Sequence, residues 1–247
     1  MTRITAFAVF SLLLVLSGCL EQEVTQEVTE KYPNGSKKTE ISYVGNRTNI
    51  VKTVRYFEDG SVQSVQRMAN GEPDSLTTIY TAGGKKYKET MYRAGKKDGA
   101  DISWYENGQI RSKTEYVQDI PTGTAVTYHE NGQKASEVSY KDGKREGTET
   151  HWYENGQKKY EVTYVNDNKN GEEKEWYENG KPKAVRTYTD NILDGPHITY
   201  YENGRKEEEM SYKMGQLHGT KTYWLSSGQK KSTAEYKNGD MVSGRVF

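Results

Sequence analysis

The sequence has a single cysteine, Cys19, and five prolines among its 247 residues. One cysteine excludes a disulfide bond within the chain, so disulfides cannot stabilise the fold. Leucine, isoleucine, valine and phenylalanine together number 39, about 16% of the chain. So few aliphatic side chains cannot fill a core between two packed layers, and the composition therefore favours a thin, largely solvated sheet.

A low aliphatic content is also typical of disordered chains. Two features oppose disorder: the formal net charge is zero, and 20 tyrosines supply apolar surface that a count of aliphatic residues omits. The neutral charge also argues against nucleic acid as a partner, because binding to phosphates depends on clustered basic side chains.

One phrase, Tyr-Glu-Asn-Gly, organises the chain and occurs at 105–108, 153–156, 177–180 and 201–204. Weaker copies share its final glycine, which falls at Gly35, Gly60, Gly84, Gly108, Gly132, Gly156, Gly180, Gly204 and Gly228. After one step of 25 residues every step is 24. A period of this length over nine copies indicates a repeat architecture.

Each repeat has the pattern of a β-hairpin. Asn-Gly between runs rich in Tyr, Thr and Val predicts a two-residue type I′ turn, in which both central residues need positive φ. With Asn155-Gly156 as the loop, the expected pairs are Trp152 with Lys159, His151 with Tyr160, Glu149 with Val162 and Gly147 with Tyr164. Because faces alternate along a strand, Tyr160, Val162 and Tyr164 share one face and Trp152 lies with Lys159 on the other.

Two aromatic series follow the period, one on each face. The first stands eight residues after the turn glycine and includes the predicted structural ladder of Tyr116, Tyr140, Tyr164, Tyr188 and Tyr212. The second stands four residues before the glycine and contains all four tryptophans, Trp104, Trp152, Trp176 and Trp224. Either both series only hold the sheet together, or one is an exposed platform for a ligand. If one series binds, we expect it to be the tryptophans, because Trp is enriched at binding hot spots.

A second turn joins one hairpin to the next, and a strand glycine follows it at Gly99, Gly123, Gly147, Gly171, Gly195 and Gly219. The predicted register places each of these glycines opposite the ladder tyrosine of its repeat. We expect glycine there because it leaves room for the ring to lie across the backbone, as in aromatic rescue of strand glycines.

Residues 1–18 have the pattern of a targeting segment, with Arg3 as their only charge and an apolar stretch of 11 residues, 6–16. This stretch is right for a signal-peptide core and too short to span a bilayer. It ends in Leu16-Ser17-Gly18-Cys19, which resembles the bacterial lipobox, in which the cysteine is lipidated. The alternative is an ordinary cleaved signal followed by a chance cysteine. With lipidation, residues 19–24 form a tether, and Leu20 after the cysteine implies sorting to the outer membrane in enteric-type bacteria.

The sequence shows no pattern typical of an enzyme. Its four histidines occupy four different positions of the repeat, whereas metal sites need clustered ligands. Consecutive carboxylates such as Glu207-Glu208-Glu209 alternate between the faces of a strand, and the glycine-rich turns lack the lysine and helix of a phosphate loop. We therefore expect no catalytic residues, no metal site and no cofactor.

The repeating pattern Gly…(Trp/Tyr)-Tyr-Glu-Asn-Gly-Gln…Tyr…Asp-Gly resembles the bacterial MORN-repeat variant over residues 31–240. The resemblance implies an all-β fold: an elongated single-layer antiparallel meander of β-hairpin repeats of about 24 residues, with about nine repeats in residues 25–247. It implies little about chemistry. Pairing is least certain in residues 35–84, where the copies depart from the pattern.

Together these features predict a non-catalytic, membrane-anchored repeat scaffold in the bacterial cell envelope, which binds a protein or an envelope glycan. Repeats support this interpretation because they present a long surface to an extended partner. The alternative is an antitoxin or immunity protein that neutralises a partner toxin, since some members of the resembled family carry an antitoxin-component label. A toxin gene next to this one would favour the alternative.

Overall fold

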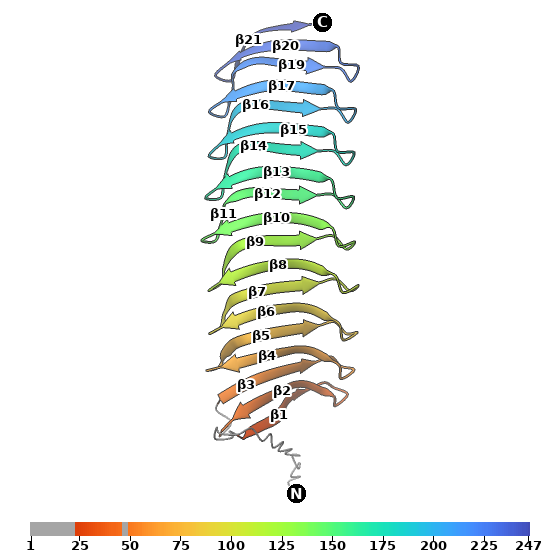
Figure 1. The fold of residues 1–247 in the computed structure, drawn as a ribbon, viewed down its shortest axis with the longest axis vertical. Helices are drawn as coiled ribbons and strands as arrows, with labels where there is room; N and C mark the ends of the chain where they lie inside the picture. Colours follow the sequence, from red (N-terminus) through yellow and green to blue (C-terminus); the bar gives the residue numbers. More distant parts are fainter. Residues whose placement is uncertain (1–22, 46–48) are drawn as a thin grey trace. The chain divides into compact units, whose positions relative to one another are not determined.

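The computed structural model describes residues 23–45 and 49–247. The chain divides into two compact units, residues 1–120 and 121–247, and each is built from antiparallel strands joined by short turns (Figure 1). The predicted signal peptide and Cys19 lie outside the described residues. No helix among the described residues is long and apolar enough to cross a membrane.

In the first unit each strand pairs antiparallel with the next one in the chain. The strands are β1 (Val24–Lys31), β2 (Lys37–Val44), β3 (Asn49–Tyr56), β4 (Val62–Ala69), β5 (Glu72–Tyr80), β6 (Lys86–Arg93), β7 (Lys96–Trp104) and β8 (Ile110–Val117). The copies in residues 35–84 therefore also pair as antiparallel hairpins, although their sequences depart from the pattern. The β1–β2 pair is less regular, with two register shifts where the later hairpins have one.

The second unit is also an antiparallel meander. Its strands are β9 (Ile120–Tyr128), β10 (Lys134–Lys141), β11 (Lys144–Arg145), β12 (Gly147–Trp152), β13 (Lys158–Val165), β14 (Asn168–Trp176), β15 (Pro182–Thr189), β16 (Ile192–Tyr200), β17 (Lys206–Lys213), β18 (Gln216–Leu217), β19 (Gly219–Trp224), β20 (Lys230–Lys237) and β21 (Asp240–Val246). A one-residue irregularity, at Glu146 and at His218, separates β11 from β12 and β18 from β19.

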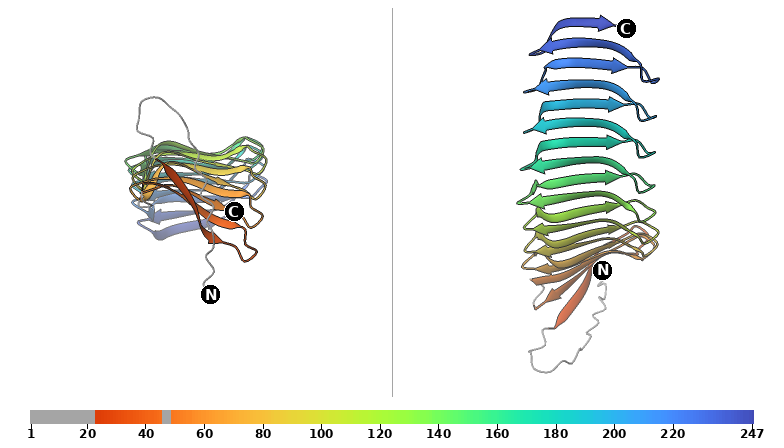
Figure 2. Two further views of the ribbon diagram at one scale, coloured as in Figure 1. Left: turned by 90° about the horizontal axis from the view of Figure 1, so that it is seen from below. Right: turned by 45° about the horizontal axis from the view of Figure 1, so that its top comes forward.

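The predicted fold class is confirmed in both units, which are all-β, single-layer antiparallel meanders (Figure 2). Few apolar side chains are buried among the described residues, namely Val54, Val162, Tyr164, Ala184 and Met210. A single layer has two solvated faces, so its side chains are mostly half-covered by same-face neighbours. This thin core agrees with the low aliphatic content.

The turn at Tyr-Glu-Asn-Gly differs from the prediction. Gly156 has φ of 83°, but Asn155 does not have positive φ. The Gly156 amide donates to the Tyr153 carbonyl at 2.9 Å, and the Tyr153 amide donates to the Gln157 carbonyl at 2.9 Å. This is a three-residue loop, a type I turn followed by a left-handed glycine, and not a two-residue type I′ loop. Asn155 Oδ1 supports it by accepting a hydrogen bond from the Gln157 amide at 2.9 Å.

The changed loop moves one lysine to the other face. The pairs of His151 with Tyr160, Glu149 with Val162 and Gly147 with Tyr164 are confirmed, but Trp152 pairs with Lys158 instead of Lys159. Lys159 is the extra residue of a β-bulge, and its Nζ lies 5.4 Å from the ring centroid of Tyr153. The prediction that Lys159 lies beside Trp152 is therefore wrong.

The type I′ geometry occurs instead at the second turn. Asn166 and Asp167 have φ of 49° and 69°, and the residues on either side of them, Val165 and Asn168, pair directly. Both central residues also have positive φ in Asn70-Gly71, Ala94-Gly95, Gln118-Asp119, Asp142-Gly143, Asp190-Asn191, Met214-Gly215 and Asn238-Gly239. The sequences of these second turns vary more than Tyr-Glu-Asn-Gly. The sequence therefore predicts the type I′ geometry for the more regular turn, although it occurs in the less regular one.

The strand glycines lie opposite the ladder tyrosines as predicted, for example Gly147 opposite Tyr164. The predicted reason is wrong, because a Cβ at Gly147 would have no heavy atom within 4 Å and the ring does not lie across it. The backbone instead needs positive φ, which is 85° at Gly147. Ser75 takes the equivalent place opposite Tyr92 with φ of 70°, so the backbone here is left-handed even without glycine. At Gly99 and Gly195 space matters as well, because a Cβ would lie 3.0 Å from Met91 and 3.1 Å from Thr187.

Side chains of the Tyr-Glu-Asn-Gly turns bind successive repeats to each other. The Tyr177 hydroxyl donates to the Tyr200 carbonyl at 2.7 Å, and Asn179 Nδ2 donates to the Glu202 carbonyl at 3.2 Å. The same tyrosine bond is made by Tyr32, Tyr153 and Tyr201, and the same asparagine bond by Asn131, Asn155 and Asn203. Two of the four residues of the phrase therefore contact the repeat that follows through their side chains.

Candidate binding surfaces

The tryptophans are half-buried and occupy the same face of their hairpins, Trp104 in the first unit and Trp152, Trp176 and Trp224 in the second. We call this face the tryptophan face. Each ring has the lysine ammonium of an earlier turn above it. The Nζ-to-centroid distances are 5.9 Å for Lys86 on Trp104, 5.9 Å for Lys134 on Trp152, 5.9 Å for Lys158 on Trp176 and 5.8 Å for Lys206 on Trp224. These distances are within the range of cation–π attraction. The tryptophans are thus partly covered, and whether they bind a partner stays a prediction.

Each of these lysines also pairs with a glutamate three residues later. The Nζ-to-carboxylate distance is 2.5 Å for Lys86 and Glu89 and 2.5 Å for Lys134 and Glu137, and Lys158 pairs likewise with Glu161. Where the lysine is replaced by Val62, Ile110 or Pro182, no glutamate follows, and the residues there are Val65, Lys113 and Val185. Sequence reasoning missed this ring–lysine–glutamate unit, although the joint replacement of both residues was visible in the period.

The opposite face, the tyrosine face, carries a second set of the same design. The guanidinium of Arg145 lies 3.9 Å from the ring centroid of Tyr164, a ring that is 5% exposed. Lys97 lies 4.6 Å from Tyr116, and Lys169 lies 5.1 Å from Tyr188. The equivalents of these cations in the repeats of Tyr140 and Tyr212 are Pro121 and Leu193, and the Tyr212 ring packs instead against His197, 6.1 Å away.

Lys97, Arg145 and Lys169 each have a carboxylate partner four residues later. Lys97 pairs with Asp101 at 2.6 Å, Arg145 pairs with Glu149 at 3.4 Å, and Lys169 pairs with Glu173. In the repeats that have Pro121 or Leu193, the position of the carboxylate holds Ala125 or His197. Both faces are therefore lined by ladders in which a ring, a cation and a carboxylate contact each other.

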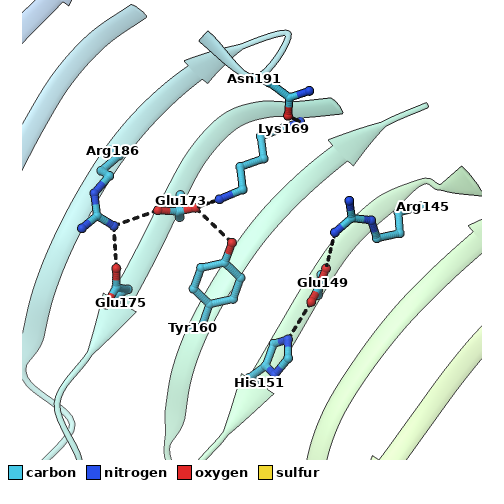
Figure 3. A network of polar contacts seen from close by, with 9 residues as sticks. All are labelled: Arg145, Glu149, His151, Tyr160, Lys169, Glu173, Glu175, Arg186 and Asn191. Atoms are coloured by element: carbon cyan, nitrogen blue, oxygen red, sulfur yellow. Dashed lines mark hydrogen bonds and ion pairs between the residues drawn. The ribbon is translucent and has the colours of Figure 1, made fainter. Parts of the chain in front are cut away.

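Glu173 is the centre of the most buried polar network, and it is 3% exposed (Figure 3). It accepts hydrogen bonds from Lys169, from Arg186 at 2.8 Å and from the Tyr160 hydroxyl at 3.0 Å. Burial alone would raise the pKa of Glu173, but these three donors outweigh it and hold the pKa below its ordinary value. Burial and the charge of Glu173 raise the pKa of Tyr160.

A second, smaller network adjoins the first one on the same face (Figure 3). His151 Nε2 and Glu149 Oε1 are hydrogen-bonded at 2.6 Å, and Arg145 pairs with the other carboxylate oxygen. The hydrogen bond with His151 holds the pKa of Glu149 below its ordinary value, against the opposing effect of burial. Glu149 is thus a fixed anion, which orients the imidazole.

A cleft of about 390 Å³ opens between these networks. Its lining combines two tyrosine rings with acids, lysines and a histidine: Tyr153, Tyr160, Glu149, Glu175, Lys159, Lys183 and His151. Trp176 also lines it, and its carbonyl accepts a hydrogen bond from the Tyr153 hydroxyl. Glu175 is held by Arg186 at 2.5 Å and by Lys183 at 3.1 Å. The sequence placed Lys159 on the tryptophan face, so this cleft could not be assembled from the predicted register.

Metal-binding residues do not gather in the part of the chain that the structure describes, where no group of three or more His, Cys, Asp or Glu side chains could hold an ion. Both ring nitrogens of His197 are buried without a hydrogen-bond partner. Burial and the nearby charge of Arg186 lower the pKa of His197, so it is a neutral packing residue.

The chain belongs to the MORN repeat variant family, whose model matches residues 97–118, 121–142, 145–166, 169–190, 193–214 and 217–238. These six segments of 22 residues cover 132 of the 247 residues. The match confirms the resemblance seen in the sequence. MORN repeats are generally scaffolds that bind proteins or membranes.

No curated protein matches the chain. Among solved structures, a variant of the Photorhabdus luminescens Tc holotoxin pore is similar over 91% of this chain, with 12% identity and a TM-score of 0.22. The similar region is 15% of that structure's own chain. A likeness this weak carries no argument about function.

We predict that Glu173→Gln destabilises the protein by about 3 kcal/mol, because the half-buried Lys169 and Arg186 lose the anion that compensates their charge. Glu161→Gln is the matched control, since its partner Lys158 is more exposed, and it should cost less than about 1 kcal/mol. Urea denaturation followed by tryptophan fluorescence gives both values. An equal loss of unfolding free energy in the two variants would contradict the prediction that Glu173 contributes more to stability than Glu161.

The stability difference between the wild type and Glu173→Gln should depend on pH. The pKa of Glu173 is lowered from its unfolded value of 4.5, so its contribution to stability is fully present above about pH 4.5. The contribution is lost as the pH falls through the folded-state pKa. The difference between wild type and Glu173→Gln should therefore shrink on acidification below that pH.

Proposed function

We propose that the protein is a non-catalytic repeat scaffold, anchored to a membrane through lipid on Cys19, that binds an extended protein or envelope glycan along its tryptophan face. The observation that carries the proposal is the repetition of one surface unit. Ring, lysine and glutamate recur at Trp152, Trp176 and Trp224 of the second unit, with the lysines at 5.8–5.9 Å from the rings. An extended partner with its own regular spacing would contact the same groups several times.

The lysine and glutamate suit this surface to recognition. Each ring keeps an apolar surface, and each ion pair offers a donor and an acceptor at its side. Side chains that are already held by one another lose little freedom on binding, so less of the contact energy is spent on ordering them. Membership of the MORN repeat variant family supports the same conclusion, because MORN repeats generally serve as scaffolds.

The chemistry of the tyrosine face supports a non-catalytic role. His151 and Glu149 are arranged like the base and orienting acid of a hydrolase. The residue that faces His151 is Tyr160, whose hydroxyl donates to Glu173 and whose pKa is raised by burial. A raised pKa makes this phenol a poor nucleophile.

Affinity capture from envelope extracts tests the proposed face. We expect Trp152→Ala with Trp176→Ala to lose the partner that the wild type captures, because two rings of the row are removed. Trp152→Tyr with Trp176→Tyr is the matched control for folding, since Tyr128 and Tyr200 occupy the same position in neighbouring repeats. If the folded alanine variant captures the partner as well as the wild type does, the tryptophan face is only structural.

The anchor is tested separately. The apolar stretch of residues 6–16 followed by Leu16-Ser17-Gly18-Cys19 motivates it. Lipoprotein processing attaches more than one acyl chain, which is what stable anchoring requires. We expect the wild type to sediment with membranes, in the outer-membrane fraction of an enteric-type host, and Cys19→Ser to be released into the soluble fraction. Membrane association of mature Cys19→Ser would refute lipid anchoring.

A further inference from the structure

Two residues that line the cleft on the tyrosine face stand at a position of the repeat that varies from hairpin to hairpin. His151 lies directly opposite Tyr160. The equivalent opposed pairs are Arg55 with Ser64, Ile79 with Lys88, Ser103 with Ser112, Thr127 with Ser136, Glu175 with Ala184, Thr199 with Glu208 and Tyr223 with Ser232. Among these described hairpins, His151 and Tyr160 form the one pair that consists of two rings.

The repeat itself does not require these rings. In the preceding hairpin the hydroxyls of Thr127 and Ser136 satisfy each other at 2.6 Å, and in the following hairpin Ala184 is almost fully buried beside Glu175. Both neighbouring pairs therefore fit the sheet without two rings. The two facing rings are therefore a feature of this hairpin and not of the repeat.

The rings are held in place before any ligand arrives. The Tyr160 hydroxyl is bound to Glu173, and His151 is bound to Glu149 at 2.6 Å. The centroids of the two rings are 5.6 Å apart, at an interplanar angle of 76°. The hydroxyl of Tyr153 donates to the Trp176 carbonyl at 2.8 Å, which fixes another wall of the cleft. A prearranged cleft saves the ligand the entropic cost of ordering its site.

The polar groups of the cleft indicate the class of ligand. Glu149 and Glu175 offer carboxylate oxygens, while Lys159 and Lys183 offer ammonium groups, so the charges of these four residues cancel. A cleft without net charge does not favour a strongly acidic or basic peptide. Fixed rings beside both donors and acceptors suit a ligand that has apolar C–H faces and many hydroxyl groups.

We propose that the cleft beside His151 and Tyr160 binds a neutral oligosaccharide, which stacks a sugar ring on the aromatic wall and shares its hydroxyl groups with Glu149, Glu175, Lys159 and Lys183. The volume of about 390 Å³ is at the small end for ligand sites, which fits a short stretch of glycan. The site lies on the face opposite the tryptophan row. It goes beyond the proposed scaffold function and does not depend on it.

The test replaces His151 and Tyr160 with the residue types that the preceding hairpin has at the same positions. His151→Thr with Tyr160→Ser recreates the hydroxyl pair of Thr127 and Ser136, so the hairpin should fold. Tyr223→Thr is the matched control, because it creates the same Thr–Ser pair opposite Ser232 in a hairpin outside the cleft. Calorimetric titration of the full chain would use hexamers of N-acetylglucosamine, of β-1,4-linked and α-1,4-linked glucose, and of mannose, with polyglutamate and polylysine peptides for comparison.

We expect at least one neutral hexamer to bind the wild type and Tyr223→Thr equally, and the His151→Thr, Tyr160→Ser variant to bind it about tenfold more weakly or not at all. The inference is overturned if no hexamer binds, if the folded double variant binds as well as the wild type, or if only a charged peptide binds. The His151→Thr, Tyr160→Ser variant should still capture the partner of the tryptophan face. Loss of sugar binding and loss of partner capture therefore test the two proposals separately.

Discussion

Hydrogen bonds from the side chains of one turn to the backbone of the next repeat hold this structure in register. A single-layer sheet has two solvated faces and buries few apolar side chains, so it cannot depend on a central core. Tyr177 and Asn179 each reach forward to a carbonyl of the following repeat, at 2.7 and 3.2 Å. The second turns reach backward: the Asp167 amide donates to the Arg145 carbonyl, and Asp167 Oδ1 accepts from the Arg145 amide. Both edges of the second unit are therefore bonded from repeat to repeat.

The two faces supply the remaining cohesion through rings, cations and carboxylates. An exposed ion pair contributes little by itself, because water screens it and two long side chains must be ordered. Here each cation also covers an aromatic ring, as Arg145 does at 3.9 Å from Tyr164. One side chain thus makes a cation–π contact, an ion pair and apolar coverage together, and the ordering cost is shared among them. Faces built in this way are also regular surfaces for a partner.

Much of the fold could be predicted from the sequence, because a 24-residue period fixes which residues are equivalent and alternation fixes which face they share. The pairing of Gly147 with Tyr164 and the two aromatic series follow from those rules alone. The turn type does not, since Asn-Gly fits both a type I′ loop and a type I turn followed by a left-handed glycine. The two differ in the φ of Asn155, and the bulge that follows turns Lys159 to the other face. The cleft could not be predicted from the sequence, because the φ of Asn155 determines on which face Lys159 lies.

The candidate binding residues were predictable to different degrees. All four tryptophans follow from the period, but the lysines above them come from the preceding turn, about 18 residues away in the sequence. The contact between such a lysine and a tryptophan depends on the distance between adjacent hairpins. The pairing rules that apply within one hairpin do not predict this distance. His151 and Tyr160 stand at a position that varies from hairpin to hairpin, so the period gives no signal for them.

The central claim, that bonds between turns stabilise the stack, is tested most directly by removing them without disturbing the turn. Tyr177→Phe deletes only the hydroxyl that binds the Tyr200 carbonyl. Asn179→Asp removes the donor to the Glu202 carbonyl and keeps an Oδ1 that can accept the Lys181 amide, as Asp59 does for Ser61. Urea denaturation of the full chain should show a loss of about 1 kcal/mol for each variant and about 2 kcal/mol for the double variant. An unchanged free energy of unfolding in the double variant would contradict the claim.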